Sequence, residues 1–173
     1  MEQLYIDFQI SCNLPFSLVQ ATSFRALIQY INPEADSLLL ESPSSIKTLL
    51  LGQFAIEKEA IRQRLQSSQS SIHLSLDSWT SSNHLPIQGV IAHTVVDSQL
   101  QEYVLALRVI QGCHTGENLA PIVLDILQDY GITHKLGYIQ MDNAANNDTL
   151  MAALSSGIYI PYSIKILVIT LIH

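Results

Sequence analysis

IHLSLDSWTSS, residues 72–82, is the stretch from which the fold of this chain is best deduced. Apolar and polar residues alternate from Ile72 to Leu76, and a period of two predicts a half-buried strand. The strand is expected to end at Asp77, before a lone Trp79 and several hydroxyl side chains. A carboxylate at the end of a core strand is held on a rigid element, as metal-assisted phosphoryl chemistry requires. The simpler interpretation, that Asp77 only caps the following loop, stays open on this stretch alone.

The composition indicates a globular domain with a real core. The chain has 173 residues, of which 48% are hydrophobic and 13% are charged. Its net charge of −7 gives no general attraction to polyanions, so tight unaided binding to nucleic acid is not expected. The only cysteines are Cys12 and Cys113, which excludes a disulfide framework and a four-cysteine zinc site. Such sparse cysteine usage fits an intracellular, reducing compartment.

The first part of the chain, residues 1–70, is expected to be a helical region. Apolar residues recur at helical spacing over residues 18–31, with Ser17 as the predicted N-cap. A second helix is predicted over residues 43–65, and the serine-rich run 67–71 then forms a short linker.

After the linker the pattern changes to strands. Residues 72–77, 86–96 and 101–110 each carry an apolar pattern typical of strands, and short loops join them. Asp97-Ser98 is typical of a tight turn between the second and the third strand. These three strands are therefore expected to form an antiparallel meander.

A helix and a fourth strand follow the meander. Apolar positions over residues 119–130 predict an amphipathic helix. Pro121 fits its first turn if Asn118 is the cap, whereas a start as early as Thr115 would put the proline inside the helix. Residues 136–141 are expected to form a buried strand that ends on Asp142, and another short helix follows. A strand–helix–strand crossover can lay this strand parallel beside the first one. The sequence thus predicts an α/β fold: three antiparallel strands, a parallel one after a helix crossover, and a preceding helical arm.

The end of the chain, residues 157–173, has a different composition. It is strongly apolar, but it is interrupted by Pro161 and Lys165 and is shorter than the roughly 20 residues of a membrane helix. It is either one more strand or sequence foreign to the domain, and we expect it to pack poorly. The predicted domains are residues 1–70, the core at 71–156, and this tail.

Two carboxylates are the candidate site. If the crossover is parallel, Asp77 and Asp142 meet at one end of the sheet, where paired carboxylates can hold hydrated Mg²⁺ against a phosphodiester. Two unrelated surface acids are the alternative. Cys113 and His114 are adjacent and too few for a closed zinc site, so we expect them to shape a loop. The scattered histidines, among them His73 and His93, are interpreted as surface or satisfied core residues.

Three motifs in order resemble hAT-superfamily transposases, notably fungal Restless-like elements. They are LSLDSWTS at residues 74–81, HTGEN at 114–118 and MDNAANN at 141–147. The upstream NLPFS at residues 13–17 is similar to the helical region before the catalytic core of these proteins. The resemblance covers about residues 5–155.

The resemblance implies a partial RNase H-like core of the DDE type. Asp77 matches the first catalytic aspartate of the family and Asp142 the second, and both would bind Mg²⁺ or Mn²⁺. The third acid, a glutamate far downstream, has no counterpart here, so we expect a chain truncated after the second aspartate that does not cleave DNA. The complete family protein would act in the nucleus on DNA at the transposon ends; for this acidic chain we expect weak DNA binding or none. A homo-oligomer is compatible with the resemblance, and a membrane partner is not expected.

Two other hypotheses remain beside the transposase fragment. The first is a non-catalytic module, relic or domesticated, that binds a partner through its helical arm or apolar tail. The second is an α/β domain with an unrelated activity, in which the two aspartates lie at opposite ends of the sheet.

Overall fold

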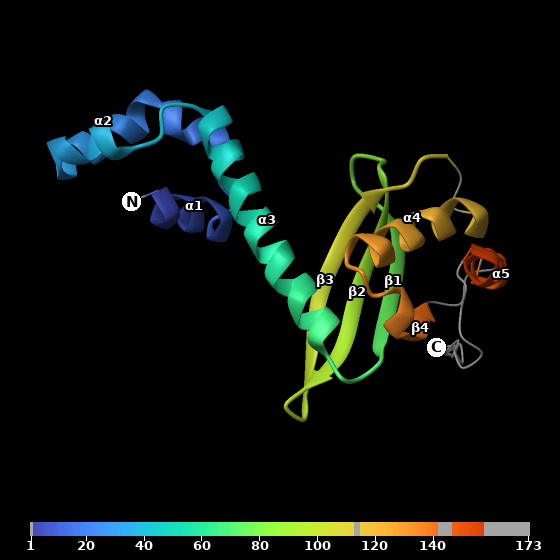
Figure 1. Ribbon diagram of the computed structural model, residues 1–173. Helices are drawn as coiled ribbons and strands as arrows, with labels where there is room; N and C mark the ends of the chain where they lie inside the picture. Colours follow the sequence, from blue (N-terminus) through green and yellow to red (C-terminus); the bar gives the residue numbers. More distant parts are fainter. Residues whose placement is uncertain (1, 113–114, 142–146, 158–173) are drawn as a thin grey trace. The chain divides into compact units, whose positions relative to one another are not determined.

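The computed structural model describes residues 2–112, 115–141 and 147–157 (Figure 1). Cys113, His114, Asp142 and the tail from residue 158 onwards therefore lie outside the described residues. By its internal contacts the chain divides into two compact units, Met1–Lys58 and Glu59–His173. This division lies within a helix, upstream of the change from helix to strand near residue 71.

The first unit is helical, as expected for this part of the chain. A small apolar core holds it together, made by Tyr5, Val19, Leu39 and Ile46. Its elements are α1 (Glu2–Ser11), the 3₁₀ helix η1 (Phe16–Gln20), α2 (Thr22–Ile31), the 3₁₀ helix η2 (Pro33–Leu38) and the first part of α3 (Pro43–Ser67).

The predicted helix over residues 18–31 with Ser17 as its cap is wrong at its start. Ala21 has an extended backbone and separates η1 from α2. The break lets Val19 enter the core, where its side chain is fully buried. The Arg25 Nε donates to the Val19 carbonyl at 2.8 Å and fixes this turn. Burial of one apolar side chain therefore outweighs continuation of the helix.

The second unit contains the predicted mixed sheet, which is confirmed. The strand order is β3-β2-β1-β4; β1–β2 and β2–β3 are antiparallel, and β1–β4 is parallel. The Asp97-Ser98 turn has positive φ angles of 50° and 61°, as the twist of a two-residue hairpin loop requires. The strands are β1 (Ile72–Thr80), β2 (Pro86–Val96), β3 (Gln99–Val109) and β4 (Leu136–Met141).

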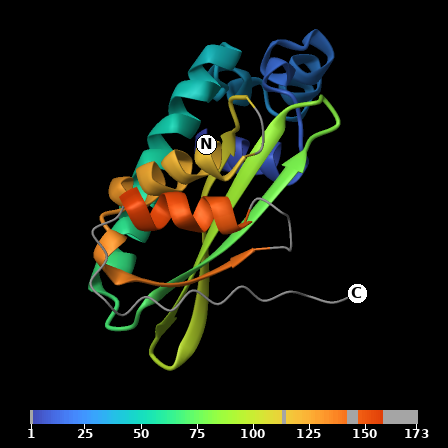
Figure 2. The same cartoon turned by 90° about the vertical axis from the view of Figure 1, so that its right-hand side faces the viewer.

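Two helices, α4 (Gly116–Asp129) and α5 (Asn147–Gly157), cover one face of this sheet (Figures 1 and 2). A short 3₁₀ helix, η3 (Thr133–Lys135), leads from α4 into β4. Ile72, Leu74 and Leu76 of β1 face these helices and are buried, while the residues that alternate with them line the open face. The main core lies between sheet and helices and includes Leu74, Val90, Val123, Ile126 and Leu127.

Of the two starts considered for α4, the structure has the earlier one rather than the start after Asn118. The helix begins at Gly116 with Thr115 as its N-cap, so Pro121 lies inside the helix rather than in its first turn. The first turn packs closely on α5, since a Cβ at Gly116 would lie 2.0 Å from the Leu150 backbone nitrogen. Gly131, with φ +65°, ends the helical segment as predicted.

Within residues 2–112, 115–141 and 147–157, no helix is both long and apolar enough to cross a membrane.

Candidate functional site

Asp77 directly follows the last parallel pair among the described residues of the sheet. That pair, between β1 and β4, is Leu76–Met141, and the next residue in the sequence after each member is an aspartate. β1 itself does not end at Asp77, as the sequence predicted, but continues to Thr80 because β2 still pairs with it there. Asp77 is thus held in a strand that pairs with β2 at this position.

The Asp77 side chain is exposed and open to a ligand. It lies on the open face of the sheet together with Ser75 and Trp79, since alternate residues of a strand share a face. It makes no hydrogen bond or ion pair to another described residue. Across the part of the chain that the structure describes, no three histidine, cysteine or acidic side chains come together to hold a metal ion. Whether Asp142 lies beside Asp77 is not tested, because Asp142 is outside the described residues.

A buried amide fixes the backbone at Asp77. The Gln88 side chain is 1% exposed, and its Nε2 donates to the carbonyls of Asp77 at 3.1 Å and Gly89 at 2.8 Å. Its Oε1 accepts a hydrogen bond from the Ser78 hydroxyl at 2.6 Å. Sequence reasoning missed Gln88, although a polar residue at a core-facing position of a strand is a usable signal.

Trp79 packs over the strand opposite Asp77. A Cβ built at Gly89 would lie 3.0 Å from Cζ3 of the Trp79 ring and 3.6 Å from the Asp77 carbonyl oxygen. The glycine therefore makes room for the ring on the open face, where Trp79 keeps 37% of its surface exposed. A glycine inside a strand is the sequence signal for such a close approach.

The two histidines of the open face are engaged in hydrogen bonds, as expected for satisfied residues. The His73 Nδ1 accepts from the Tyr138 backbone N–H at 2.9 Å, and the two rings stack with centroids 5.2 Å apart. The His93 Nε2 lies 2.8 Å from the Ser75 hydroxyl, and its Nδ1 lies 3.3 Å from a Glu102 oxygen. Both histidines line a cavity of about 270 Å³. Among the described residues, Glu102 is the only acid that contacts either of them.

Known proteins with similar sequences include transposases. The chain is 30% identical over 159 residues to “Putative transcriptional regulator tpeD” of Talaromyces stipitatus. The matched region covers 91% of this chain and 19% of that protein. It is 25% identical over 135 residues to “Putative AC transposase” and “Putative AC9 transposase” of Zea mays, covering 78% of this chain and 16% of each. The chain thus spans less than a fifth of the length of these relatives.

A family profile matches the same part of the chain. The profile of the ZBED1 RNase-like domain matches residues 75–162, half of the chain, beginning within β1 and extending past α5. This range contains the meander from Ser75 onwards, the crossover helix and both aspartates. The chain therefore belongs to the family of ZBED1 RNase-like domains, which is related to the hAT-type transposases.

Proposed function

We propose that this chain is the first part of the catalytic core of a Restless-like hAT transposase. In the complete protein the core would cleave DNA at the transposon ends and transfer the strands, in the nucleus. The observation that supports this is the parallel pair Leu76–Met141, because an aspartate follows each of its members in the sequence. Adjacent parallel strands carry the residues at their carboxyl ends to the same edge of a sheet.

Asp77 and Asp142 are the residues that would hold the metal ion. Carboxylate oxygens are the ligands that Mg²⁺ and Mn²⁺ prefer, and the exposed, unengaged side chain of Asp77 fits this use. A bound ion of this kind activates water and stabilises the leaving oxygen of a phosphodiester. The role of Gln88 is to fix the backbone from which Asp77 projects.

The chain by itself is proposed to be inactive in cleavage. Two carboxylates match the family motif, and no residue of this chain matches the third acid. With an incomplete ligand set, metal binding should be weak, and a phosphodiester would not be held between the carboxylates and the ion. We therefore expect no nicking of terminal-repeat DNA in the presence of Mg²⁺ or Mn²⁺.

Metal titration tests the proposed site. Calorimetry with Mn²⁺ should give weak binding that Asp77→Asn and Asp142→Asn each reduce by about tenfold, since each removes a charged ligand. Asp125→Asn, which changes an exposed aspartate of α4, is the matched control and should leave binding unchanged. Equal affinity in Asp77→Asn and the unchanged chain would refute the site. If the unchanged chain nicks DNA and the Asp77→Asn variant does not, the proposed metal site is supported and the proposed inactivity is wrong.

A non-catalytic role is the second candidate function. It is favoured by the relative named as a transcriptional regulator, which matches 91% of this chain. In that case the domain binds a partner and the aspartates are dispensable. A stable complex that forms equally well with Asp77→Asn and Asp142→Asn would support this role over the catalytic one.

A further inference from the structure

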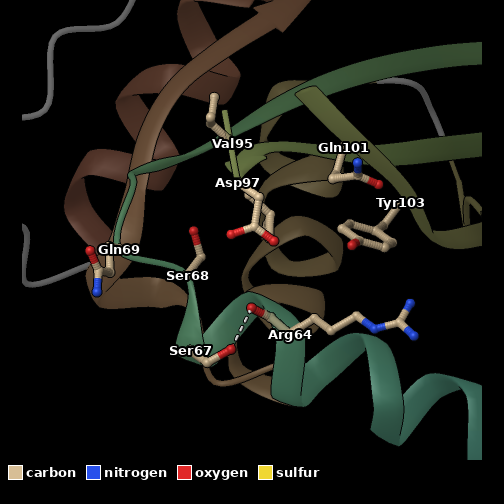
Figure 3. A pocket seen from close by; sticks show the side chains of 9 residues that line it. Arg64, Ser67, Ser68, Gln69, Val95, Asp97, Gln101 and Tyr103 are labelled. Carbon is tan, nitrogen blue, oxygen red and sulfur yellow. Dashed lines mark hydrogen bonds between the residues drawn. The ribbon is translucent and has the colours of Figure 1, made fainter. Parts of the chain in front are cut away.

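A second cavity lies at the β2–β3 hairpin, at the other end of β2 from the Asp77 partner Gly89 (Figure 3). Its volume is about 570 Å³, within the range of roughly 300–1,000 Å³ typical of small-molecule sites. The last turn of α3 and the following linker form one wall, and the hairpin forms the other. The side chains that matter for binding are those of Arg64, Asp97, Gln101 and Tyr103.

The helical wall of this cavity is rigidly held. The Lys135 Nζ donates to the Leu65 carbonyl at 3.4 Å, to the Ser68 carbonyl at 2.7 Å, and to the Gln66 carbonyl. An ammonium among the last carbonyls of a helix also complements the negative end of its dipole. The Gln66 Nε2 donates to the Tyr130 carbonyl at 2.9 Å, which fastens the same turn to the end of α4. Arg64 therefore projects from a fixed element.

The linker is fixed to the hairpin as well. Thr94 is 1% exposed, and its hydroxyl lies 2.7 Å from the Ser68 hydroxyl and 2.8 Å from the Ser70 hydroxyl. These hydroxyls satisfy one another, so they are not the groups that await a ligand. Both walls are thus preorganised, which lowers the entropic cost of binding a ligand between them.

The charged groups in the cavity are not paired with each other. Among the described residues, no hydrogen bond or ion pair engages the side chains of Arg64, Asp97 or Gln101. Other arginines of this unit do have acidic partners: Arg62 pairs with Glu59, and Arg108 pairs with Asp125. Figure 3 shows the side chains of Arg64, Tyr103 and Asp97 around the same space. The cavity therefore offers a cation, an aromatic ring and a carboxylate at once.

We propose that this hairpin cavity binds a nucleoside monophosphate. The planar fork of Arg64 matches a phosphate group, and the Tyr103 ring offers a face on which a base can stack. The Asp97 carboxylate accepts hydrogen bonds from ribose hydroxyls, as acidic residues do in nucleotide-binding folds. The Gln101 amide would form hydrogen bonds with the edge of the base. This site does not depend on the metal site proposed at Asp77.

Nucleotide titration of the full chain, followed by amide NMR shifts, tests this site. AMP, GMP, CMP and UMP are the probes, and inorganic phosphate and adenosine are the partial ligands. We expect shifts at the hairpin and the end of α3, with weaker binding of either partial ligand. Arg64→Gln should weaken nucleotide binding by about tenfold, the effect of losing one charge-assisted hydrogen bond. Tyr103→Leu should weaken it by about fivefold through lost stacking.

The controls separate this proposal from the metal site. Arg62→Gln, on the same helix but outside the cavity, and Asp77→Asn should both leave nucleotide binding unchanged. Circular dichroism should be used to check that each variant is folded. Arg64→Gln is expected to fold normally, because the Arg64 side chain is exposed. Absence of binding by all four nucleotides, equal binding in Arg64→Gln, or loss of binding in Asp77→Asn would each overturn the proposal.

Discussion

At the residue scale, Gln88 and Gly89 show how the position of Asp77 depends on the neighbouring strand. The Gln88 amide ties the Asp77 carbonyl to β2, and Gly89 leaves space for the Trp79 ring beside it. Neither residue belongs to one of the three sequence motifs. Their importance follows from the antiparallel register, which pairs Asp77 with Gly89 and Ser78 with Gln88.

Tyr130 gives a pH-dependent prediction. Burial, together with the nearby Asp129 carboxylate, raises the pKa of the Tyr130 hydroxyl above its usual value of 10.0, although Arg108 opposes this. The hydroxyl donates to the Leu105 carbonyl at 3.0 Å in its protonated form. Because the folded pKa exceeds the unfolded one, this stabilisation is complete below pH 10 and is lost as pH rises through the folded pKa.

Tyr130→Phe should therefore flatten the alkaline loss of stability. At pH 8 the free energy of unfolding of the variant should be about 1 kcal/mol lower than that of the unchanged chain, because one hydrogen bond is missing. Between pH 9 and pH 11 the free energy of unfolding should then fall less in the variant than in the unchanged chain. Urea unfolding at several pH values measures this difference. Tyr138→Phe, which makes the same chemical change at an exposed tyrosine, is the control. Parallel profiles for Tyr130→Phe and the unchanged chain would contradict the prediction.

At the scale of elements, two helical glycines should respond in opposite ways to alanine. Gly116→Ala places a Cβ against the Leu150 backbone, 2.0 Å from its nitrogen, so α4 and α5 must separate. Such overpacking should cost about 1–3 kcal/mol. Gly52 lies in α3 with nothing within 4 Å of its would-be Cβ, and Gly52→Ala should stabilise its helix by about 1 kcal/mol.

Thermal and urea unfolding of both variants, followed by circular dichroism, measure this contrast. The pair serves as its own control, since the chemical change is the same and only the surroundings differ. Gly116→Ala with unchanged stability would mean that α4 does not pack on α5 as closely as the structure shows.

At the scale of the whole molecule, the chain contains two separate apolar cores. One belongs to Met1–Lys58 and includes Ile46, and the other belongs to Glu59–His173 and includes Leu127; both side chains are fully buried. A compact unit with a core of its own can open as a separate cooperative unit.

Alanine substitutions should consequently act on one unit at a time. Leu127→Ala should lower the opening free energy of amides in the sheet unit, Glu59–His173, by about 2–5 kcal/mol. Ile46→Ala should lower the opening free energy of amides in the helical unit, Met1–Lys58, by a similar amount. Native-state hydrogen exchange resolves the two sets of amides. If Leu127→Ala destabilises the helical unit to the same extent, the chain unfolds as a single unit and the prediction fails.

From residue 72 onwards, the sequence by itself determined the type and order of the strands and α-helices. The alternation over residues 72–76 identified β1, and the apolar run at residues 136–141 gave the bounds of β4. The helix between them allowed the parallel crossover that the structure shows. These features follow from periodicity and chain connectivity, which are local properties. The candidate aspartates also came from the sequence, through their places at the ends of apolar runs, and the role of Asp142 stays a prediction.

Tertiary structure alone decided where elements begin and which distant side chains meet. α5 packs against the first turn of α4 at Gly116. α2 starts late because Val19 is buried, and β1 continues past Asp77 because β2 pairs with it. The cavity of Arg64 and Tyr103 likewise joins residues far apart in the chain. Burial and pairing between distant segments contribute more free energy than local preference, so a single segment of sequence cannot reveal them.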